Sequence, residues 1–347
     1  MPAPTLRSLA RDLGVSRTTI SEALRGSSRV RPATAERIRA AAEKAGYSHN
    51  PLAGAIMSEL RRSRGELFRG VLAVVALEEP DRPAYAARFY SELIRGATER
   101  AAELGFKVEH FTLNADLTQR RLNQILQSRG IRGIILMPTW RDPDFLGIDW
   151  SRYAGVYLDY HIERPALRCI CSDHFRSMMV SLERLHGLGY RRPGVILPSH
   201  QDQRLHHRWE GAFLAFQRHH PSPKPVPPLV ADVINQTVFT AWFLRYQPDV
   251  VLGHLVEAMG WMRAAGAKIP RTHGFFCLNL VHAQPDQPCA GLDLSPHQIG
   301  LRGVDVVISQ LHRNERGVPK ANSLTTLPSI WVDGPTLRRQ TGQAPAV

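Results

Sequence analysis

The chain has 347 residues, of which 43% are hydrophobic and 22% charged, values typical of a globular protein with two or three domains. No run of about 18 apolar residues predicts a membrane span, and the N-terminus lacks the apolar stretch of a secretory signal. We therefore expect a cytoplasmic protein whose cysteines are reduced thiols, namely Cys169, Cys171, Cys277 and Cys289.

The net charge of +13 is distributed unevenly along the chain. Residues 1–65 hold 12 Lys and Arg against 5 Asp and Glu, a net charge of +7. Over half of the positive excess therefore lies in under a fifth of the chain. A basic terminal domain favours a polyanionic partner, most simply nucleic acid.

Three short helices are predicted within residues 1–49. Apolar residues recur at helical spacing in each, and the expected start and stop residues flank them. Thr5 and Ser16 are placed to cap the first two helices, Gly14 to end the first, and Pro32 to open the third. The buried stripes are Leu6, Leu9, Ala10 and Leu13; Ile20, Ala23 and Leu24; and Ala35, Ile38, Ala42 and Ala45.

The two-residue link Gly14-Val15 between the first two helices is typical of a helix-turn-helix. The second helix has only a thin apolar stripe, which indicates that its other face lies against a polar partner. Its first turns would reach base edges in the major groove. The residues expected to read bases are Arg17, Thr18 and Glu22, and those expected to contact phosphates are Ser16, Ser21 and Arg25. A three-helix bundle with no DNA role is the alternative.

The segment from "TLRSLARDLGVSRTTISEALRG" to "GYSHNPLAGAI" resembles the DNA-binding headpiece of the lactose-repressor (LacI/GalR) family over about fifty residues without gaps. This resemblance implies DNA contacts by Thr5 and the residues named above. One position departs from the family, which usually has Arg where this chain has Glu22. Because a carboxylate accepts a hydrogen bond from cytosine N4, the usual family operator is not expected here.

Residues 50–67 are similar to the hinge of the same family. The resemblance implies a helix that forms on DNA, with Asn50 and Ala53 at contact positions and Ile56 as an apolar wedge in the minor groove. Gly54 lowers helix propensity, which agrees with a helix that forms only when bound. A flexible basic linker is the alternative.

From Gly70 onward, apolar strand patterns alternate with amphipathic helices, and such βαβ alternation predicts parallel sheets. The predicted fold class is a helix-turn-helix headpiece followed by an α/β core of two doubly wound subdomains, covering 68–347. This core resembles the family's effector-binding domain and periplasmic sugar-binding proteins. The resemblance implies a first subdomain of about 68–173 and 298–322, and a second of about 174–297 and 323–347.

Ligands of open α/β sheets bind at the carboxyl ends of strands. By that rule, residues that follow predicted strands are candidates for ligand contacts. The family resemblance adds the arginine that begins "RWEGAF". A guanidinium can form paired hydrogen bonds with hydroxyls or a carboxylate, and an indole ring can stack on a sugar face. The candidate effector-binding residues are Glu78, Trp140, Asp173, Arg208, His254 and Asn279.

The sequence lacks the glycine-rich phosphate loops, the nucleophile elbow and the paired cysteines of common enzymes and metal sites. The histidines of "RLHHRW" are adjacent, and adjacent residues on a helix point apart, so no metal and no cofactor is expected. We predict a homodimeric transcription regulator, most simply a repressor, that binds a pseudo-palindromic double-stranded DNA operator under control of a sugar-like effector. The alternatives are an orphan regulator without an effector, and a cytoplasmic sugar-binding protein or enzyme.

Overall fold

The computed structural model describes residues 6–24, 30–45, 68–80, 82, 86–283 and 286–340; for residues 6–8, 17 and 21 only the backbone is described. The chain divides into two compact units, one of residues 1–70 with 308–315 and one of residues 71–307 with 316–347. Several predicted DNA contacts lie outside the described residues and stay predictions, namely Thr5, Arg25, Asn50, Ala53 and Ile56, together with the whole of the hinge at 50–67.

The N-terminal unit contains the three predicted helices, α1 (Leu6–Leu13), α2 (Arg17–Leu24) and α3 (Pro32–Lys44). Gly14 has a φ of +65°, and its N–H and that of Val15 donate to the carbonyls of Arg11 and Ala10. This pairing is a Schellman motif, which ends α1 and lets the chain turn directly into α2. The apolar stripes meet in one small core of Leu9, Ala10, Ile20, Ala23, Val30, Ala35, Ile38 and Ala42.

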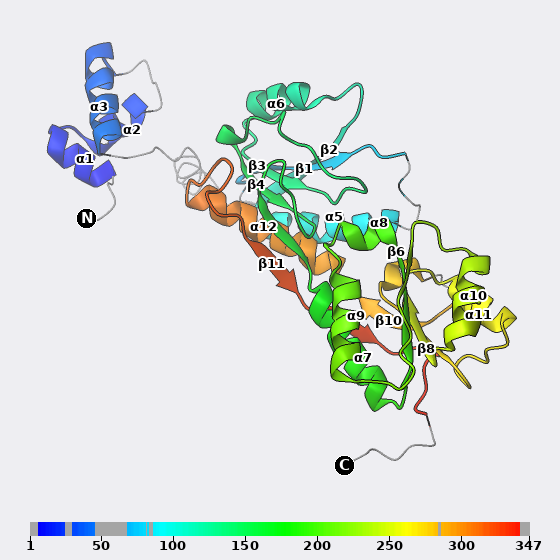
Figure 1. The fold of residues 1–347 in the computed structure, drawn as a ribbon. Coiled ribbons are helices and arrows are strands. Elements are labelled where there is room, and N and C mark those ends of the chain that lie inside the picture. The colour runs from blue at the N-terminus through cyan, green and yellow to red at the C-terminus, as the bar shows by residue number, and fades with distance from the viewer. Residues whose placement is uncertain are drawn as a thin grey trace. The chain divides into compact units, whose positions relative to one another are not determined.

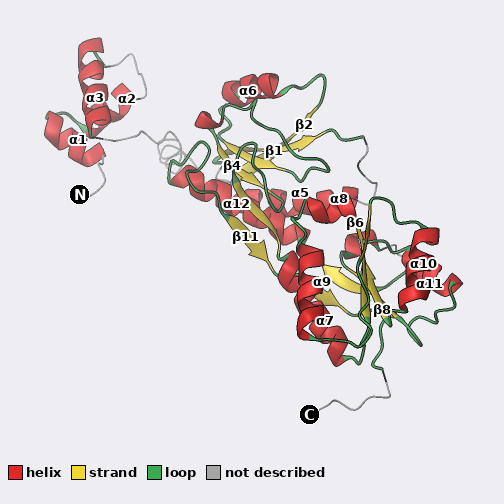
Figure 2. Cartoon of the chain, viewed as in Figure 1, coloured by secondary structure: helices red, strands yellow, loops and turns green. Residues whose placement is uncertain are grey.

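The described strands of the second unit form two six-stranded sheets (Figures 1 and 2). The first has the order β11-β5-β4-β3-β1-β2 and the second β12-β10-β9-β8-β6-β7. The first sheet contains β1 (Gly70–Leu77), β2 (Phe106–Leu113), β3 (Gly133–Leu136), β4 (Ala154–Tyr157), β5 (Arg168–Ser172) and β11 (Leu324–Leu327). The second contains β6 (Pro193–Pro198), β7 (Leu229–Ala231), β8 (Val250–Gly253), β9 (Gly274–Cys277), β10 (Ala290–Asp293) and β12 (Ile330–Val332).

Helices cover both sheets, and three of those described begin with a side-chain cap. Thr118, Asp173 and Asn235 each accept a hydrogen bond from a backbone N–H of the first helical turn that follows. The helices of this unit are α5 (Ala86–Glu103), α6 (Gln119–Ser128), α7 (His174–Gly187), α8 (Ser199–Gln203), α9 (Arg208–His219), α10 (Gln236–Tyr246), α11 (Ala258–Ala264) and α12 (Pro296–His312). Among the described helices, none combines the length and the apolar character needed to cross a membrane.

The chain passes between the two sheets after β5, after β10 and after β11, which matches the predicted two-subdomain arrangement. One boundary differs from the expected one. The sequence places residues from 323 onward in the second subdomain, but Leu324–Leu327 pair with Cys169–Ser172 in the first sheet. The third crossing therefore follows Leu327, and only β12 joins the second sheet, where it lies antiparallel to β10.

Helices α5 and α12 approach closely at two glycines. A Cβ atom built on Gly96 would lie 2.0 Å from the carbonyl oxygen of His297, and one on Gly300 would lie 2.0 Å from that of Leu93. Backbone oxygens cannot swing away as a side-chain tip can. The two helices therefore pack at this distance only because both positions lack a side chain.

Replacing Gly300 with alanine is expected to lower the free energy of unfolding by about 1–3 kcal/mol, because the added methyl group forces the helices apart. Gly260→Ala on α11 is the matched control. No atom lies within 4 Å of a Cβ built there, so the better helix former should raise stability, by at most about 1 kcal/mol. Urea unfolding of both variants checks this. A Gly300→Ala protein as stable as the wild type would contradict the packing argument.

Candidate functional site

The predicted contact residues whose side chains are described lie at the start of the second helix of the N-terminal unit and along it. Ser16 and Thr18 are exposed and Glu22 is half-buried, while Arg17 and Ser21 lie in α2. The Ser16 hydroxyl accepts a hydrogen bond from the Thr19 N–H at 3.1 Å, which confirms the predicted helix cap. The helix-turn-helix geometry therefore exists, whereas contacts of these side chains with bases or phosphates stay predictions.

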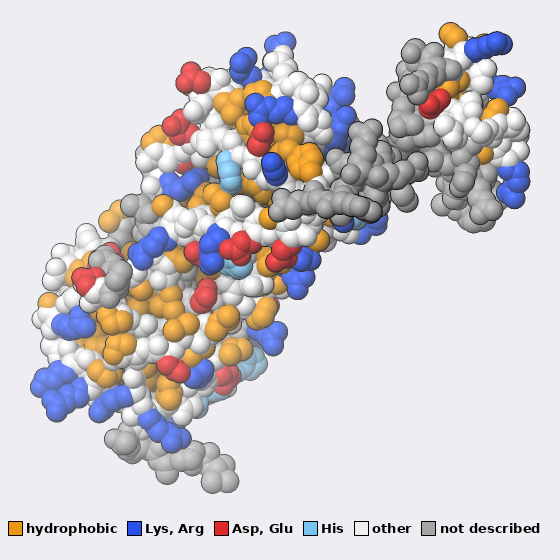
Figure 3. Space-filling model, turned by 180° about the vertical axis from the view of Figure 1, so that it is seen from behind, with side chains coloured by type: hydrophobic (Ala, Val, Ile, Leu, Met, Phe, Trp, Pro, Cys, Tyr) orange, Lys and Arg blue, Asp and Glu red, His pale blue; other side chains and the backbone are white. Residues whose placement is uncertain are grey.

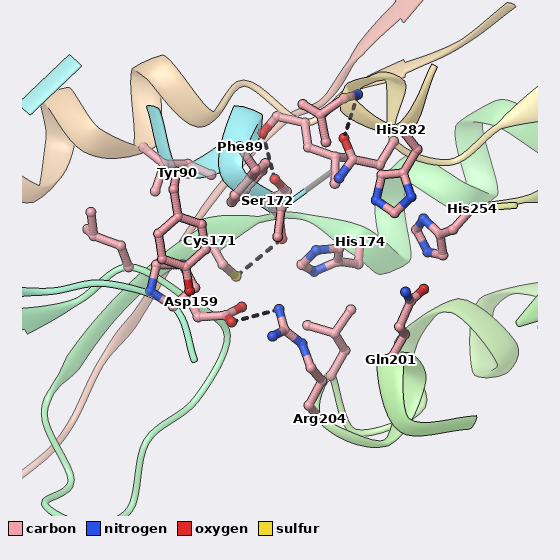
Figure 4. A pocket seen from close by; sticks show the side chains of 18 of the residues that line it. Phe89, Tyr90, Asp159, Cys171, Ser172, His174, Gln201, Arg204, His254 and His282 are labelled. Atoms are coloured by element: carbon pink, nitrogen blue, oxygen red, sulfur yellow. Dashed lines mark hydrogen bonds and ion pairs between the residues drawn. The ribbon is translucent and has the colours of Figure 1, made fainter. Parts of the chain in front are cut away.

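A cavity lies between the carboxyl ends of the two sheets of the core (Figure 4). Its empty space, which includes the open mouth, is about 770 Å³, of which about 100 Å³ can hold the centre of a water-sized molecule, and its lining is mostly apolar. Its walls come from the residues after β3, β4 and β5 on one side, and from those after β6, β8, β9 and β10 on the other. The lining includes Phe89, Tyr90, Trp140, Asp159, Ser172, His174, Gln201, Arg204, Trp209, His254, Asn279 and His282. This position is the one that the strand-end rule predicts.

An ion pair crosses this cavity. Arg204 follows α8, and its Nη2 lies 2.8 Å from Oδ2 of Asp159, which follows β4 of the other sheet. Its Nη1 donates to the carbonyl oxygen of Thr139 at 2.6 Å. Figure 4 shows the two charged groups facing one another. Because each charge compensates the other, the pair offers donors and acceptors to a ligand without a net charge.

Three histidines gather in the cavity beside Trp209, and all three are neutral near pH 7. Burial lowers the pKa of His174 to about 3, with Arg204 and Arg208 contributing, and lowers that of His282 to about 4. Burial also lowers the pKa of His254, helped by the neighbouring imidazole of His282. A neutral imidazole has one donor and one acceptor nitrogen, so it can bond either side of a hydroxyl group.

Several buried polar atoms of this wall have no hydrogen-bond partner among the described residues. They are Nδ1 of His174, Nδ1 of His254 and Nε1 of Trp209. The rings of His174 and His254 pack edge-on against Trp209, with centroid distances of 5.1 and 5.7 Å. An unsatisfied buried polar group is costly, by about 1–3 kcal/mol. The wall of the cavity therefore contains polar atoms for which the described residues provide no partner.

Neither Cys171 nor Ser172, a thiol and a hydroxyl among the described lining residues, is activated as a nucleophile. Burial raises the pKa of the Cys171 thiol well above its usual range, so the group is not a thiolate. The Ser172 hydroxyl donates to the carbonyl oxygen of Leu294 at 2.6 Å rather than to a base. The arrangement is suited to binding an uncharged polyhydroxylated molecule between aromatic surfaces.

Three of the six predicted effector residues line the cavity together: Trp140, His254 and Asn279. The Trp140 ring contacts His200 edge-on, with centroids 4.8 Å apart. His254 and Asn279 are buried at the ends of β8 and β9. The side-chain oxygen of Asn279 accepts from the Val281 N–H at 3.3 Å, which leaves its amide nitrogen available.

The other three are not among the residues that line this cavity: Glu78, Asp173 and Arg208. Glu78 is exposed, and it is its neighbour Glu79 that turns inward and accepts from the Trp140 and Arg141 N–H groups. Asp173 caps α7 through the Arg176 N–H, and Arg208 stacks on the ring of Tyr160 at 4.3 Å. Their contact with an effector stays a prediction.

Several lining residues were not predicted from the sequence, although the strand-end rule points to some of them. Asp159 follows β4, and Gln201 and Arg204 follow β6, so each lies just beyond the carboxyl end of a strand. Applying the rule to every predicted strand would have nominated them. His174 likewise follows β5, whereas Phe89 and Tyr90 lie on α5 and no local pattern marks them as cavity residues.

Comparisons with known proteins agree with this architecture. Residues 5–50 match the family described as bacterial regulatory proteins, lacI family. The transcriptional regulator CelR of Thermobifida fusca is 27% identical over 199 residues, covering 56% of this chain and 55% of its own length. The transcriptional regulator GntR of Pseudomonas aeruginosa is 27% identical over 283 residues, 77% of each chain. In this sequence comparison the chain thus spans little more than half of the length of CelR.

Solved structures show the same fold. A transcriptional regulator CelR–cellobiose complex superposes with a TM-score of 0.58 and 18% identity, covering 96% of this chain and 99% of that one. The lac repressor dimer bound to operator and the anti-inducer ONPF gives a TM-score of 0.55 and 16% identity over the same shares. Residues 5–50, which include the helix-turn-helix, thus match the lacI family of bacterial regulatory proteins, and the two-sheet core has the fold of these solved regulators.

Proposed function

We propose that this protein is a sequence-specific DNA-binding transcription regulator, most simply a repressor, that acts in the cytoplasm and catalyses no reaction. An uncharged sugar or sugar derivative, bound between the two sheets of the core, sets its affinity for DNA. The observation that carries the proposal is the cavity itself, where a compensated ion pair and unsatisfied neutral polar atoms lie among aromatic side chains. The related CelR is solved with cellobiose, which supports a carbohydrate as the class of effector.

The proposed regulator acts as a homodimer on a pseudo-palindromic operator. A two-fold symmetric dimer presents two helix-turn-helix units to two half-sites. Apolar side chains gather on the face seen in Figure 3, over the part of the core that holds the second sheet. Exposed apolar patches of this kind favour a protein interface.

Glu22→Arg is expected to change the preferred base at one symmetric pair of operator positions, a change of about 1–3 kcal/mol, because an acceptor for cytosine becomes a donor pair for guanine. Selection of bound fragments from random DNA measures the preference. Glu43→Arg on α3 is the matched control, since it changes the charge equally at an exposed position outside α2. An unchanged preference for Glu22→Arg would remove Glu22 from the base-reading surface.

Thermal denaturation with a panel of carbohydrates tests the effector. A compound that stabilises the wild type should lose at least tenfold in affinity for Arg204→Met, because a charge-assisted contact contributes about 1.5–3 kcal/mol. Arg208→Met tests the arginine that the family resemblance implies. Arg184→Met is the control, since Arg184 pairs with Asp333 and stacks on Trp331, and neither of these residues lines the cavity.

The outcomes of that experiment separate the candidates. Wild-type affinity in Arg204→Met, for a variant that unfolds cooperatively, would place the effector elsewhere. If only Arg208→Met weakens binding, the family residue rather than the ion pair holds the ligand. If no compound stabilises the wild type while it still selects specific DNA, the protein is an orphan regulator.

The neutral histidines predict a dependence of stability on pH. Because the folded pKa values of His174 and His282 lie near 3 and 4, below the ordinary 6.5, the unfolded chain binds more protons as the pH falls below 6.5. Each histidine should then reduce the free energy of unfolding by about 1.4 kcal/mol per pH unit between pH 6 and 5. Urea unfolding should give a shallower slope for His282→Gln than for the wild type. Equal slopes would mean that His282 is protonated in the folded protein.

A further inference from the structure

A second cluster of polar side chains lies where α8 meets α9. Among the described residues, Asp202, His207 and Glu210 form a group whose ligand atoms all lie within 4.8 Å of one another. None of the three lines the effector cavity. Asp202 is completely buried, whereas the His207 side chain is about half exposed and that of Glu210 partly so. The group therefore opens to solvent on one side and rests on a buried carboxylate on the other.

The histidine nitrogen lies between the two carboxylates. Nδ1 of His207 is 3.4 Å from Oε2 of Glu210 and 4.0 Å from Oδ2 of Asp202. Two ligand atoms bound to one zinc ion at about 2.0–2.2 Å lie roughly 3.3–3.5 Å apart in tetrahedral geometry. The first distance fits this geometry, the second is longer, and all three ligand atoms lie within 4.8 Å of one another.

The buried carboxylate is held in a fixed orientation. Oδ1 of Asp202 accepts from the Trp209 N–H at 3.0 Å, and Oδ2 accepts from the Glu210 N–H at 3.1 Å. The backbone carbonyl of Asp202 also accepts from the Leu205 and His207 N–H groups. Hydrogen bonds that orient a ligating carboxylate in this way are the usual support of a metal ligand. A lone pair of Oδ2 remains for an ion.

The histidines of "RLHHRW" were expected to lie on a helix and to bind no metal, but their backbone conformation is not helical. Adjacent histidines on a helix point apart, but His206 and His207 precede α9 and have φ values of +51° and +56°. In this left-handed turn the two imidazoles take different neighbours. His206 packs against the rings of Tyr160 and His161, and His207 turns to the carboxylates.

We propose that Asp202, His207 and Glu210 bind one divalent transition-metal ion of the zinc class, with water completing the coordination. One imidazole nitrogen and two carboxylate oxygens form a donor set that zinc accepts. Two carboxylates compensate the charge of one dication. The bound ion would connect Asp202 of α8 with the start of α9. The segment between these helices contains Arg204 and Leu205, both of which line the effector cavity. The proposal does not depend on the identity of the effector.

Isothermal titration of the full-length chain with zinc chloride, in buffer without a chelator, tests the site. One saturable high-affinity ion per chain is expected. His207→Ala and Glu210→Gln should each weaken its binding at least about tenfold, since even the residues that support a metal ligand contribute about 10–100-fold. Titration with cobalt chloride should give a visible absorption spectrum that neither variant reproduces.

His206→Ala is the matched control, because it removes a neighbouring imidazole from the same left-handed turn and should leave zinc affinity unchanged. The chain has 15 histidines, so weak additional binding common to all variants carries no weight. Equal affinity in the wild type and His207→Ala would overturn the proposal. So would a loss of binding in His206→Ala as large as that in His207→Ala, or the absence of a saturable ion in the wild type.

Discussion

The ion pair of Arg204 with Asp159 is the interaction on which the arrangement of the core depends. It joins a residue after β6 of the second sheet to residues after β3 and β4 of the first, because Arg204 also donates to the carbonyl of Thr139. A charge removed from water must be paired and hydrogen-bonded, and both conditions are met only when the carboxyl ends of the sheets face each other. The same facing arrangement creates the cavity.

The cavity has a definite chemical character because its polar groups are neutral or compensated. Burial beside Trp209 keeps His174 and His254 uncharged, and the surrounding protein leaves one nitrogen of each without a partner. Filling these positions with apolar side chains would give a tighter core, so the unsatisfied atoms are a local loss of stability. Such losses are typical of binding sites, where a ligand supplies the missing partners.

Much of the fold follows from local patterns in the sequence. The helical spacing and flanking Ser16, Gly14 and Pro32 predict α1 to α3, and the buried apolar runs predict β1, β3 and β6. Other elements carry no such signal. The helix α10 has the sequence QTVFTAWFLRY, whose apolar residues run round most of its surface, and β11 is largely exposed. The third crossing was misplaced because β11 is fixed by pairing with β5, a long-range contact that no local pattern contains.

The residues of the site could be predicted from the sequence only where they follow the carboxyl end of a strand. Strand ends nominated Trp140, His254 and Asn279 because parallel strands bring their carboxyl ends together. Phe89 and Tyr90 enter from α5 instead, and their positions depend on how that helix packs, which is set by contacts between distant segments. Contacts between the two halves of the core also determine how a ligand in the cavity could regulate the protein. A ligand changes the balance between two arrangements only through contacts that differ between them. Arg88 donates to the carbonyl of Ala283 and Ser172 to that of Leu294, so contacts across the cavity already link both halves. A molecule that competes for Arg204 and Asp159 therefore acts directly on the interaction that holds the halves together.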